Sequence, residues 1–193
     1  MISHKYWIKH KDKILSQFQF KQELKAQSAA ILNELLSNIG LSRTDTILVG
    51  IHARRGDYLT EVHVKRGFIP ALPSYINSVI QHFTEKKDVI ALNKTLVFLI
   101  VGNDLEWNRQ MAQNYTNVLV PLQRHTREED LCLLTLCDHY AMSVGTFGLW
   151  AGLLSSPTAI VTYQKSMFQP NSRKALNYEN SLESFVLPNW TPL

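Results

Sequence analysis

The stretch Thr46-Ile47-Leu48-Val49-Gly50-Ile51-His52-Ala53-Arg54-Arg55-Gly56-Asp57-Tyr58 joins an apolar run to a cluster of charged side chains. No charged residue lies between Thr46 and Ile51, and most of these residues are β-branched or aliphatic. Such a run predicts a strand that is buried on both faces, as in a parallel sheet. Because open α/β sheets bind ligands beyond the carboxyl ends of their strands, we expect the charged residues to face a binding crevice.

Similar apolar segments recur along the chain and alternate with helical patterns. Further strands are predicted at residues 95–101, 117–120, 140–144 and 158–163, and helices at 74–83, 105–113, 126–138 and 149–154. This alternation predicts an α/β fold with a doubly wound, mostly parallel sheet and right-handed crossovers. The proline-containing C-terminal tail is expected to pack loosely, if at all.

A basic helical segment precedes the first strand. Leu24, Ile31, Leu35 and Leu36 form an apolar stripe on a helix over residues 23–39, and Gly40 is a helix stop. This stripe can cover its own domain, which is the favoured interpretation, dock on something else, or lie on a membrane surface. A boundary near residues 41–45 divides the chain into a helical segment, 1–45, and a domain, 46–193.

Composition restricts the class of protein. The chain has 193 residues, 45% of them hydrophobic, which suffices for one domain with a sizeable core. Most of the net charge of +4 lies in residues 1–45, which argues against a nucleic-acid surface spread over the fold. The spacing of Cys132 and Cys137 favours buried free thiols over a disulfide or a metal site.

The sequence gives few signals of cellular location. No apolar run reaches the ~18 residues that a membrane span needs, and the N-terminus has no secretory h-region. Three glycosylation sequons, at Asn93, Asn114 and Asn189, hint at the secretory pathway.

The loop after the first strand is the first candidate site. Alternate strand side chains share a face, so His52 and Arg54 point one way and Ala53 and Arg55 the other. An unpaired guanidinium is costly away from water, so Arg54 needs an anion, and phosphate suits its planar fork. The alternatives are a salt bridge from Arg54 to a neighbouring loop and a surface ion pair between Arg55 and Asp57.

The turn Ser143-Val144-Gly145-Thr146-Phe147-Gly148 is the second candidate site. It joins a predicted strand to a helix N-terminus, where free N–H groups and a hydroxyl bind anions. Its sequence is neither a P-loop nor a Gly-rich dinucleotide motif. Two anion-binding turns at strand ends of one sheet support each other.

Asp138 is placed by the pattern at the end of a helix. A carboxylate there faces the unfavourable end of the helix dipole, which suggests a task. Recognition of the N–H edge of a base and a buried hydrogen bond both stay open.

The segment 52–58 resembles the H-x-R-R-G-D-Y motif of the α-1,2-fucosyltransferases, glycosyltransferase family 11. Residues 130–139 and 143–151 are similar to the second signature of that family, in the same order and at a similar separation. The resemblance implies a two-domain GT-B fold, of which this chain is similar to the Rossmann-like, donor-binding C-terminal half. It also implies inverting transfer of L-fucose from GDP-β-L-fucose to O2 of a terminal galactose, with no metal.

The resemblance assigns roles to the candidate residues. Arg54 would clamp the β-phosphate and act in catalysis, His52 would lie beside the pyrophosphate or ribose, and Asp57 would orient the arginines. Asp138 would read the guanine edge. The phosphate end would be lined by Gly145, Thr146 and Phe147.

The family's N-terminal half, with its Gly-rich opening, has no counterpart in this sequence. A GT-B site lies between two lobes, so we expect an incomplete acceptor pocket, assign no catalytic base and doubt turnover by this chain alone. The resemblance implies a location at the lumenal side of the Golgi membrane, through an anchor that these residues lack.

Two functions follow, an α-1,2-fucosyltransferase or a non-catalytic GDP-sugar-binding or interaction module. The tripeptide Arg55-Gly56-Asp57 also matches an adhesion motif, but such tripeptides are common by chance. Nucleic-acid binding is disfavoured because the basic excess lies in one segment without aromatic platforms in the sheet.

Overall fold

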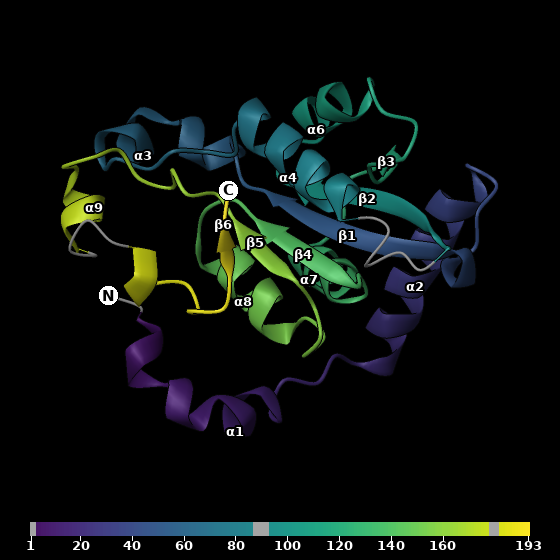
Figure 1. Cartoon of the computed structure of the whole chain (residues 1–193), viewed down its shortest axis with the longest axis horizontal. Helices are drawn as coiled ribbons and strands as arrows, with labels where there is room; N and C mark the ends of the chain where they lie inside the picture. Colours follow the sequence, from purple (N-terminus) through teal and green to yellow (C-terminus); the bar gives the residue numbers. More distant parts are fainter. Residues whose placement is uncertain (1–2, 87–92, 178–181) are drawn as a thin grey trace.

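A computed structural model describes residues 3–86, 93–177 and 182–193. In these residues a parallel six-stranded sheet has the order β3-β2-β1-β4-β5-β6, shown in Figure 1. The strands are β1 Thr46–Ala53, β2 Thr95–Gly102, β3 Val118–Leu119, β4 His139–Met142, β5 Val161–Tyr163 and β6 Thr191–Pro192. This order is that of the Rossmann fold, so the predicted doubly wound sheet is confirmed.

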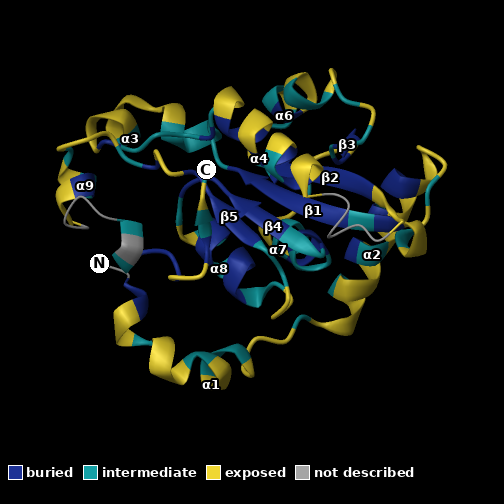
Figure 2. Cartoon of the chain, in the orientation of Figure 1, coloured by how far each residue is buried: buried dark blue, intermediate teal, exposed yellow. Residues whose placement is uncertain are grey.

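Helices cover both faces of the sheet (Figure 1). One face holds α4 Pro73–Glu85 and α6 Leu105–Ala112, and the other holds α2 Gln22–Ser37, α7 Arg127–Thr135 and α8 Thr146–Leu154. Val49 and Ile51 of β1 pack towards α4, whereas Leu48 packs towards α7, because alternate strand residues point to opposite faces. Figure 2 shows the result, a buried sheet between helices with exposed outer sides.

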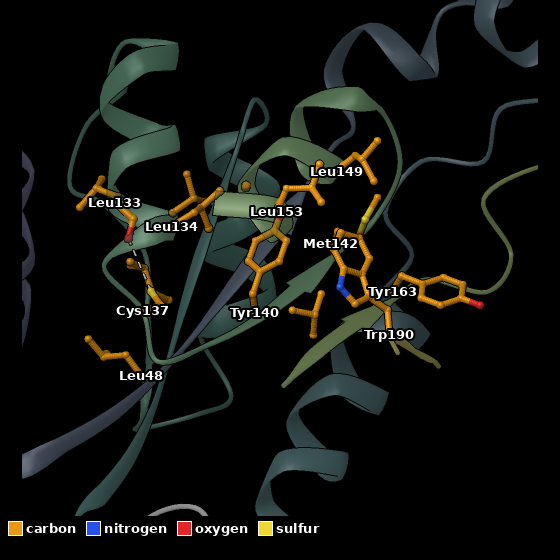
Figure 3. Packing of buried hydrophobic residues seen from close by; sticks show 14 of the residues in the cluster. Leu48, Leu133, Leu134, Cys137, Tyr140, Met142, Leu149, Leu153, Tyr163 and Trp190 are labelled. Atoms are coloured by element: carbon orange, nitrogen blue, oxygen red, sulfur yellow. Dashed lines mark hydrogen bonds between the residues drawn. The ribbon is translucent and has the colours of Figure 1, made fainter. Parts of the chain in front are cut away.

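The core on the α7 and α8 side is drawn in Figure 3. Tyr140 is fully buried, and its hydroxyl donates to the Gly148 carbonyl oxygen at 3.0 Å. Both cysteines are free and buried, as predicted, and the Cys137 thiol donates to the Leu133 carbonyl oxygen at 3.6 Å. Burial raises the pKa of Cys137 to about 12, so this thiol stays protonated and unreactive and packs in the core.

The N-terminal segment packs on the sheet domain. Leu32, Leu35 and Leu36 of α2 belong to the same core as β1, so the helix covers its own domain. The arm before it contains η1 His4–Tyr6, η2 Ile8–His10 and α1 Lys11–Leu15, and Phe18 stacks on Trp150 of α8 at 4.8 Å. The division at residue 45 stays a prediction, and residues 1–2 lie outside the described part of the chain.

The prediction of a loosely packed tail is wrong. Phe185, Val186, Leu187 and Trp190 are buried, and β6 extends the sheet by pairing with β5. Pro192 is compatible with this strand because it lies at the edge of the sheet, where no ladder N–H is needed. The sequence pattern missed β6 because two paired residues show no periodicity.

Other element bounds differ modestly from the predictions. The apolar run 140–144 forms β4 only up to Met142, and the helix predicted over 126–138 ends at Thr135. The remaining short helices are η3 Arg43–Asp45, η4 Gly56–Leu59, α3 Glu61–Lys65, α9 Arg173–Asn177 and η5 Leu182–Ser184. Within the described residues, no helix combines the length and apolarity that crossing a bilayer requires.

Candidate functional site

Arg54 follows β1 at the carboxyl edge of the sheet, where its backbone is held by β4. Its N–H donates to the hydroxyl of the buried Ser143 at 2.9 Å. Its Nη2 lies 2.9 Å from Asp57 Oδ2, and the ring of Tyr58 lies 5.5 Å from the guanidinium carbon. Arg54 therefore forms a salt bridge, but with a carboxylate of its own loop and not, as the alternative had it, with a neighbouring loop.

That salt bridge leaves most of the guanidinium available. Among the described residues, Asp57 is the one side-chain hydrogen-bond partner of the Arg54 guanidinium, which carries five N–H donors. Asp57 is itself fixed, because its Oδ1 accepts from Asn103 Nδ2 at 3.1 Å. Asp57 thus orients Arg54 with one oxygen while the second oxygen anchors it to the end of β2.

Arg55 has other partners than Asp57, so the alternative of an ion pair between Arg55 and Asp57 is not realised. Its Nη1 donates to the Ala71 carbonyl oxygen at 2.7 Å, and its Nε lies 3.6 Å from Asp104 Oδ2. The guanidinium stacks over Trp107 at 4.3 Å from the ring centroid. Arg55 points to the face opposite Arg54, as strand alternation requires, so it meets α6 and not Asp57.

The turn 143–148 lies beside this loop, as predicted. Gly145 has φ 99°, and a Cβ at this position would lie 3.1 Å from Tyr58 Oη. Only glycine combines this backbone conformation with such a close approach. Thr146, which begins α8, is exposed, and the first N–H groups of the helix lack intrahelical partners.

His52 packs against the turn 143–148 from the side of the core. It is 3% exposed, and its ring lies 5.2 Å from that of Phe147. Burial, with the nearby Arg54 charge, lowers the pKa of His52 to about 3, so the ring is neutral at pH 7. A Cβ on Gly148 would lie 2.8 Å from His52 Nδ1, which explains the glycine at this contact.

Asp138 lies at the opposite, amino edge of the sheet, just before β4. Its Oδ1 pairs with Arg43 Nη2 at 2.8 Å, and its Oδ2 accepts from the Leu48 N–H at 2.8 Å. The structure therefore does not bring Asp138 together with Arg54 and the turn 143–148. Of the two alternatives, a structural hydrogen bond is the one that its contacts fit, although the Asp138 side chain is only partly buried.

A pocket at the carboxyl ends of β2 and β3 was not anticipated from the sequence. Its volume is about 180 Å³, and it shares Asn103 with the Arg54 loop. A cavity of about 150 Å³ holds benzene, so a flat heterocycle fits the space. The lining residues are Val101, Gly102, Asn103, Leu105, Asn108, Pro121, Gln123, Arg124, His125, Arg127 and Asp130.

Several buried polar atoms of this pocket lack partners among the described residues. Asn108 is 1% exposed, and neither its Oδ1 nor its Nδ2 has a hydrogen bond among the described residues; the same holds for Nδ1 of His125. Burial, followed by the charge of Glu129, raises the pKa of Asp130 to about 7. Unpaired buried groups are costly, and perturbed carboxyl groups in a pocket are typical of binding sites.

The pocket residues that were not predicted from the sequence follow a pattern that is also present at the first loop. Gly102-Asn103-Asp104 follows the second buried strand as His52–Asp57 follows the first, so the same edge argument applies. Asp130 lies in the first turn of α7, where an acidic residue is ordinarily explained by the helix dipole. Thr126 and Glu129 form a capping box there, whereas Asp130 lies four residues beyond Thr126 and faces the pocket.

His63 stands on the other side of Tyr58, with ring centroids 4.8 Å apart. The Thr60 hydroxyl donates its one hydrogen to the Asp57 carbonyl oxygen at 2.7 Å, and lies 3.1 Å from His63 Nδ1. Because the Thr60 hydrogen is used, Nδ1 must be the donor of this contact. Neutral His63 therefore carries its proton on Nδ1 and keeps Nε2 as an acceptor.

A family model described as "Glycosyl transferase family 11" matches residues 2–193. The chain belongs to glycosyltransferase family 11. Among curated proteins, the family 11 chain is similar to "Galactoside alpha-(1,2)-fucosyltransferase 1" of Homo sapiens, 27% identical over 93% of this chain and 47% of the relative. The protein of that name from Leontopithecus chrysomelas is 28% identical over the same shares. The chain thus spans about half the length of these relatives.

Solved structures are less similar to this chain than the curated relatives are. A NodZ alpha-1,6-fucosyltransferase co-crystallised with GDP matches 70% of this chain and 42% of its own, with 14% identity and a TM-score of 0.44. A glycosyl transferase of family 9 from Veillonella parvula DSM 2008 matches 77% of this chain and 36% of its own, with 15% identity and a TM-score of 0.45.

Proposed function

We propose that this chain binds GDP-β-L-fucose across the carboxyl edge of its sheet and serves transfer of L-fucose to O2 of a terminal galactose. The observation that carries the proposal is the adjacency of a guanidinium with free donors, a helix-end turn and an unsatisfied polar pocket at neighbouring strand ends. The acceptor is inferred from the galactoside fucosyltransferase relatives. The Golgi location and an independence from metal remain part of this proposal.

The diphosphate is placed at Arg54 and the turn 143–148. When GDP leaves, negative charge accumulates on its β-phosphate and positive charge develops on the sugar ring. The Arg54 guanidinium is held by Asp57, and the Arg54 backbone is held by the Ser143 hydroxyl; together with the free N–H groups of α8, this guanidinium is preorganised to stabilise that charge. The diphosphate and Asp57 share the Arg54 guanidinium. Because Asp57 leaves other N–H donors of this guanidinium unused, the diphosphate binds without breaking the ion pair.

The guanine is placed in the pocket around Asp130. An ionised carboxylate accepts two hydrogen bonds, and guanine offers adjacent N1–H and N2–H donors on one edge. Asn108 and His125 supply further donors and acceptors that lack partners within the described part of the chain. Asp130 replaces Asp138 as the residue proposed to read the base, because Asp138 lies at the other edge of the sheet.

The proton of the acceptor hydroxyl is assigned to Nε2 of His63. The two nearby carboxylates are engaged, since Asp57 binds Arg54 and Asn103, and Glu61 binds Lys65. His63 in contrast keeps a free acceptor next to Tyr58. We expect His63→Gln to lower transfer with little effect on GDP-fucose binding; loss of transfer in Glu61→Gln with activity kept in His63→Gln would move the role to Glu61.

The proposal is tested by titration calorimetry of the full chain with GDP, ADP and UDP. GDP is expected to bind at least about tenfold more tightly than the other two, and Asp130→Asn to remove that discrimination while Glu128→Gln, an exposed change on the same helix, keeps it. Equal binding of all three nucleotides contradicts the proposal. GDP-fucose binding without transfer to lactose identifies the alternative, a GDP-sugar-binding module.

A further inference from the structure

A second polar pocket lies on the carboxyl side of the sheet, away from the Asp130 pocket. Its volume is about 250 Å³, and its lining residues are Arg66, Arg173, Lys174 and Asn177. None of these is acidic, and within the described ranges neither Arg66 nor Arg173 forms an ion pair. Three cations around one concavity repel one another unless an anion joins them.

The pocket is built from two segments that are far apart in the sequence. Phe68 and Phe168 pair as an antiparallel bridge, and the Gln169 N–H donates to the Gly67 carbonyl oxygen at 2.8 Å. In Figure 1, α3 and α9 accordingly lie at the same end of the molecule. These hydrogen bonds hold Arg66 and the start of α9 next to each other, so the concentration of charge is fixed by the backbone.

A row of aromatic rings connects this pocket to Arg54. Lys174 Nζ lies 4.9 Å from the centroid of Phe68, and Phe68 stacks on Tyr58 at 4.7 Å. Tyr58 in turn faces the Arg54 guanidinium. An extended ligand that reaches Arg54 therefore passes over Tyr58 and Phe68 to arrive at the cations.

The strand order places the two pockets on opposite sides of β1. The Asp130 pocket lies over the ends of β2 and β3, whereas Arg173 and Lys174 belong to the segment after β5. A nucleotide that runs from Asp130 to Arg54 does not extend to Arg66 and Arg173. The cationic pocket thus lies outside the path proposed for the nucleotide, which leaves it free for a second substrate.

We propose that the pocket of Arg66, Arg173, Lys174 and Asn177 binds an anionic group, a sulfate ester or a carboxylate, that is carried by the acceptor saccharide. This inference rests on the proposed function. Arginine donors recognise both oxyanions through paired N–H groups. Through this site the chain binds an acidic galactoside more tightly than the same galactoside without its acidic group.

The test measures binding of lactose, 3′-sulfated lactose and 3′-sialyllactose to the full chain saturated with GDP. We expect at least one acidic saccharide to bind about tenfold more tightly than lactose at low salt, with the preference reduced at 1 M salt, where the Debye length is about 3 Å. Arg66→Gln with Arg173→Gln should abolish the preference and leave GDP affinity unchanged. Lys9→Gln with Lys13→Gln removes two charges from the exposed part of the N-terminal arm and should keep it.

The proposal would be overturned by equal binding of lactose and both acidic saccharides, by no binding of any saccharide while GDP binds, or by a preference that survives the double arginine substitution. Free sulfate that binds as tightly as sulfated lactose would identify a simple anion site and reject the acceptor role. Failure of the proposed function is recognised separately, because the wild-type chain would then not bind GDP.

Discussion

At the amino edge of the sheet the charged side chains satisfy one another, whereas at the carboxyl edge some of them keep polar groups without a partner among the described residues. Asp138 uses both oxygens, for Arg43 and the Leu48 N–H, and Arg43 also donates to the carbonyl oxygens of Thr46 and Leu136. At the carboxyl edge Arg54 has one carboxylate partner, and the carboxylate of Asp130 has no hydrogen-bond partner among the described residues. Similar side chains thus form a closed network at one edge and an open one at the other.

The difference distinguishes residues whose contacts stabilise the fold from residues whose polar groups are open to a ligand. A closed ion pair stabilises the folded chain, and its removal costs stability without changing binding. Open groups such as Asn108 and Asp130 cost folding free energy until a ligand satisfies them. The following experiments test this comparison, in order of decreasing expected effect.

Arg54→Ala should produce the largest change. We expect GDP affinity to fall about 100-fold, on the order of 3 kcal/mol, because a preorganised donor to the diphosphate is lost. Calorimetry measures the effect, and circular dichroism verifies the fold. Arg43→Ala is the control at the amino edge and should bind GDP normally; an unchanged GDP affinity in Arg54→Ala would remove Arg54 from the site.

Asp138→Ala should act on stability alone. The substitution leaves the Leu48 N–H without its acceptor and Arg43 without its counter-ion, so we expect the free energy of unfolding to fall by about 2 kcal/mol. Urea titration measures the change. GDP affinity should stay within about twofold of wild type; a collapse of GDP affinity with unaltered stability would restore Asp138 as the base-reading residue.

GDP binding should weaken on acidification. In the free chain the pKa of Asp130 is about 7, and guanine N–H donors bind the ionised carboxylate, so protonation opposes binding. Between pH 8 and pH 6 the affinity should fall about tenfold. The other charged groups near this carboxyl are Arg124, His125, Arg127 and Glu129.

Asp130→Asn is the reference for that experiment. It keeps His125, the arginines and the titrating phosphate of GDP, and it should lose the part of the pH dependence that belongs to Asp130. A pH profile identical in wild type and Asp130→Asn would show that this carboxyl takes no part in binding.

The pH dependence of stability should show the smallest effect. The pKa of His52 falls from 6.5 to about 3 on folding, so its contribution to stability is complete above pH 6.5 and is lost as the pH falls towards 3. The raised pKa of Asp130 acts oppositely, since the folded chain binds that proton more tightly between about pH 4 and pH 7. The two effects nearly cancel in the wild-type chain.

The cancellation can be removed by substitution. In Asp130→Asn we expect the free energy of unfolding to drop by about 1 kcal/mol between pH 6.5 and pH 5.5, because only the His52 effect remains. Adding His52→Asn should flatten the profile. A flat profile in Asp130→Asn itself would mean that His52 is not held neutral by burial.

Sequence reasoning located the Arg54 loop and the turn 143–148 because both depend on local order. A charged segment that directly follows a buried strand must lie at the carboxyl edge, and β1 and β4 are parallel neighbours. The base-reading role of Asp138 came from the resemblance and not from such an argument. A residue between α7 and β4 lies at the amino edge of a parallel sheet, whether it ends the helix or precedes the strand.

The sequence by itself determined the doubly wound sheet, the family and the loop that carries Arg54, because apolar periodicity and contiguous motifs are properties of neighbouring residues. Tertiary structure decided that Asp57 holds Arg54 and not Arg55, that Asn103, Asn108 and Asp130 share one pocket, and that the tail completes the sheet. These are contacts between residues far apart in the chain or on opposite faces of a strand. Only packing brings such residues together, so no local pattern encodes them.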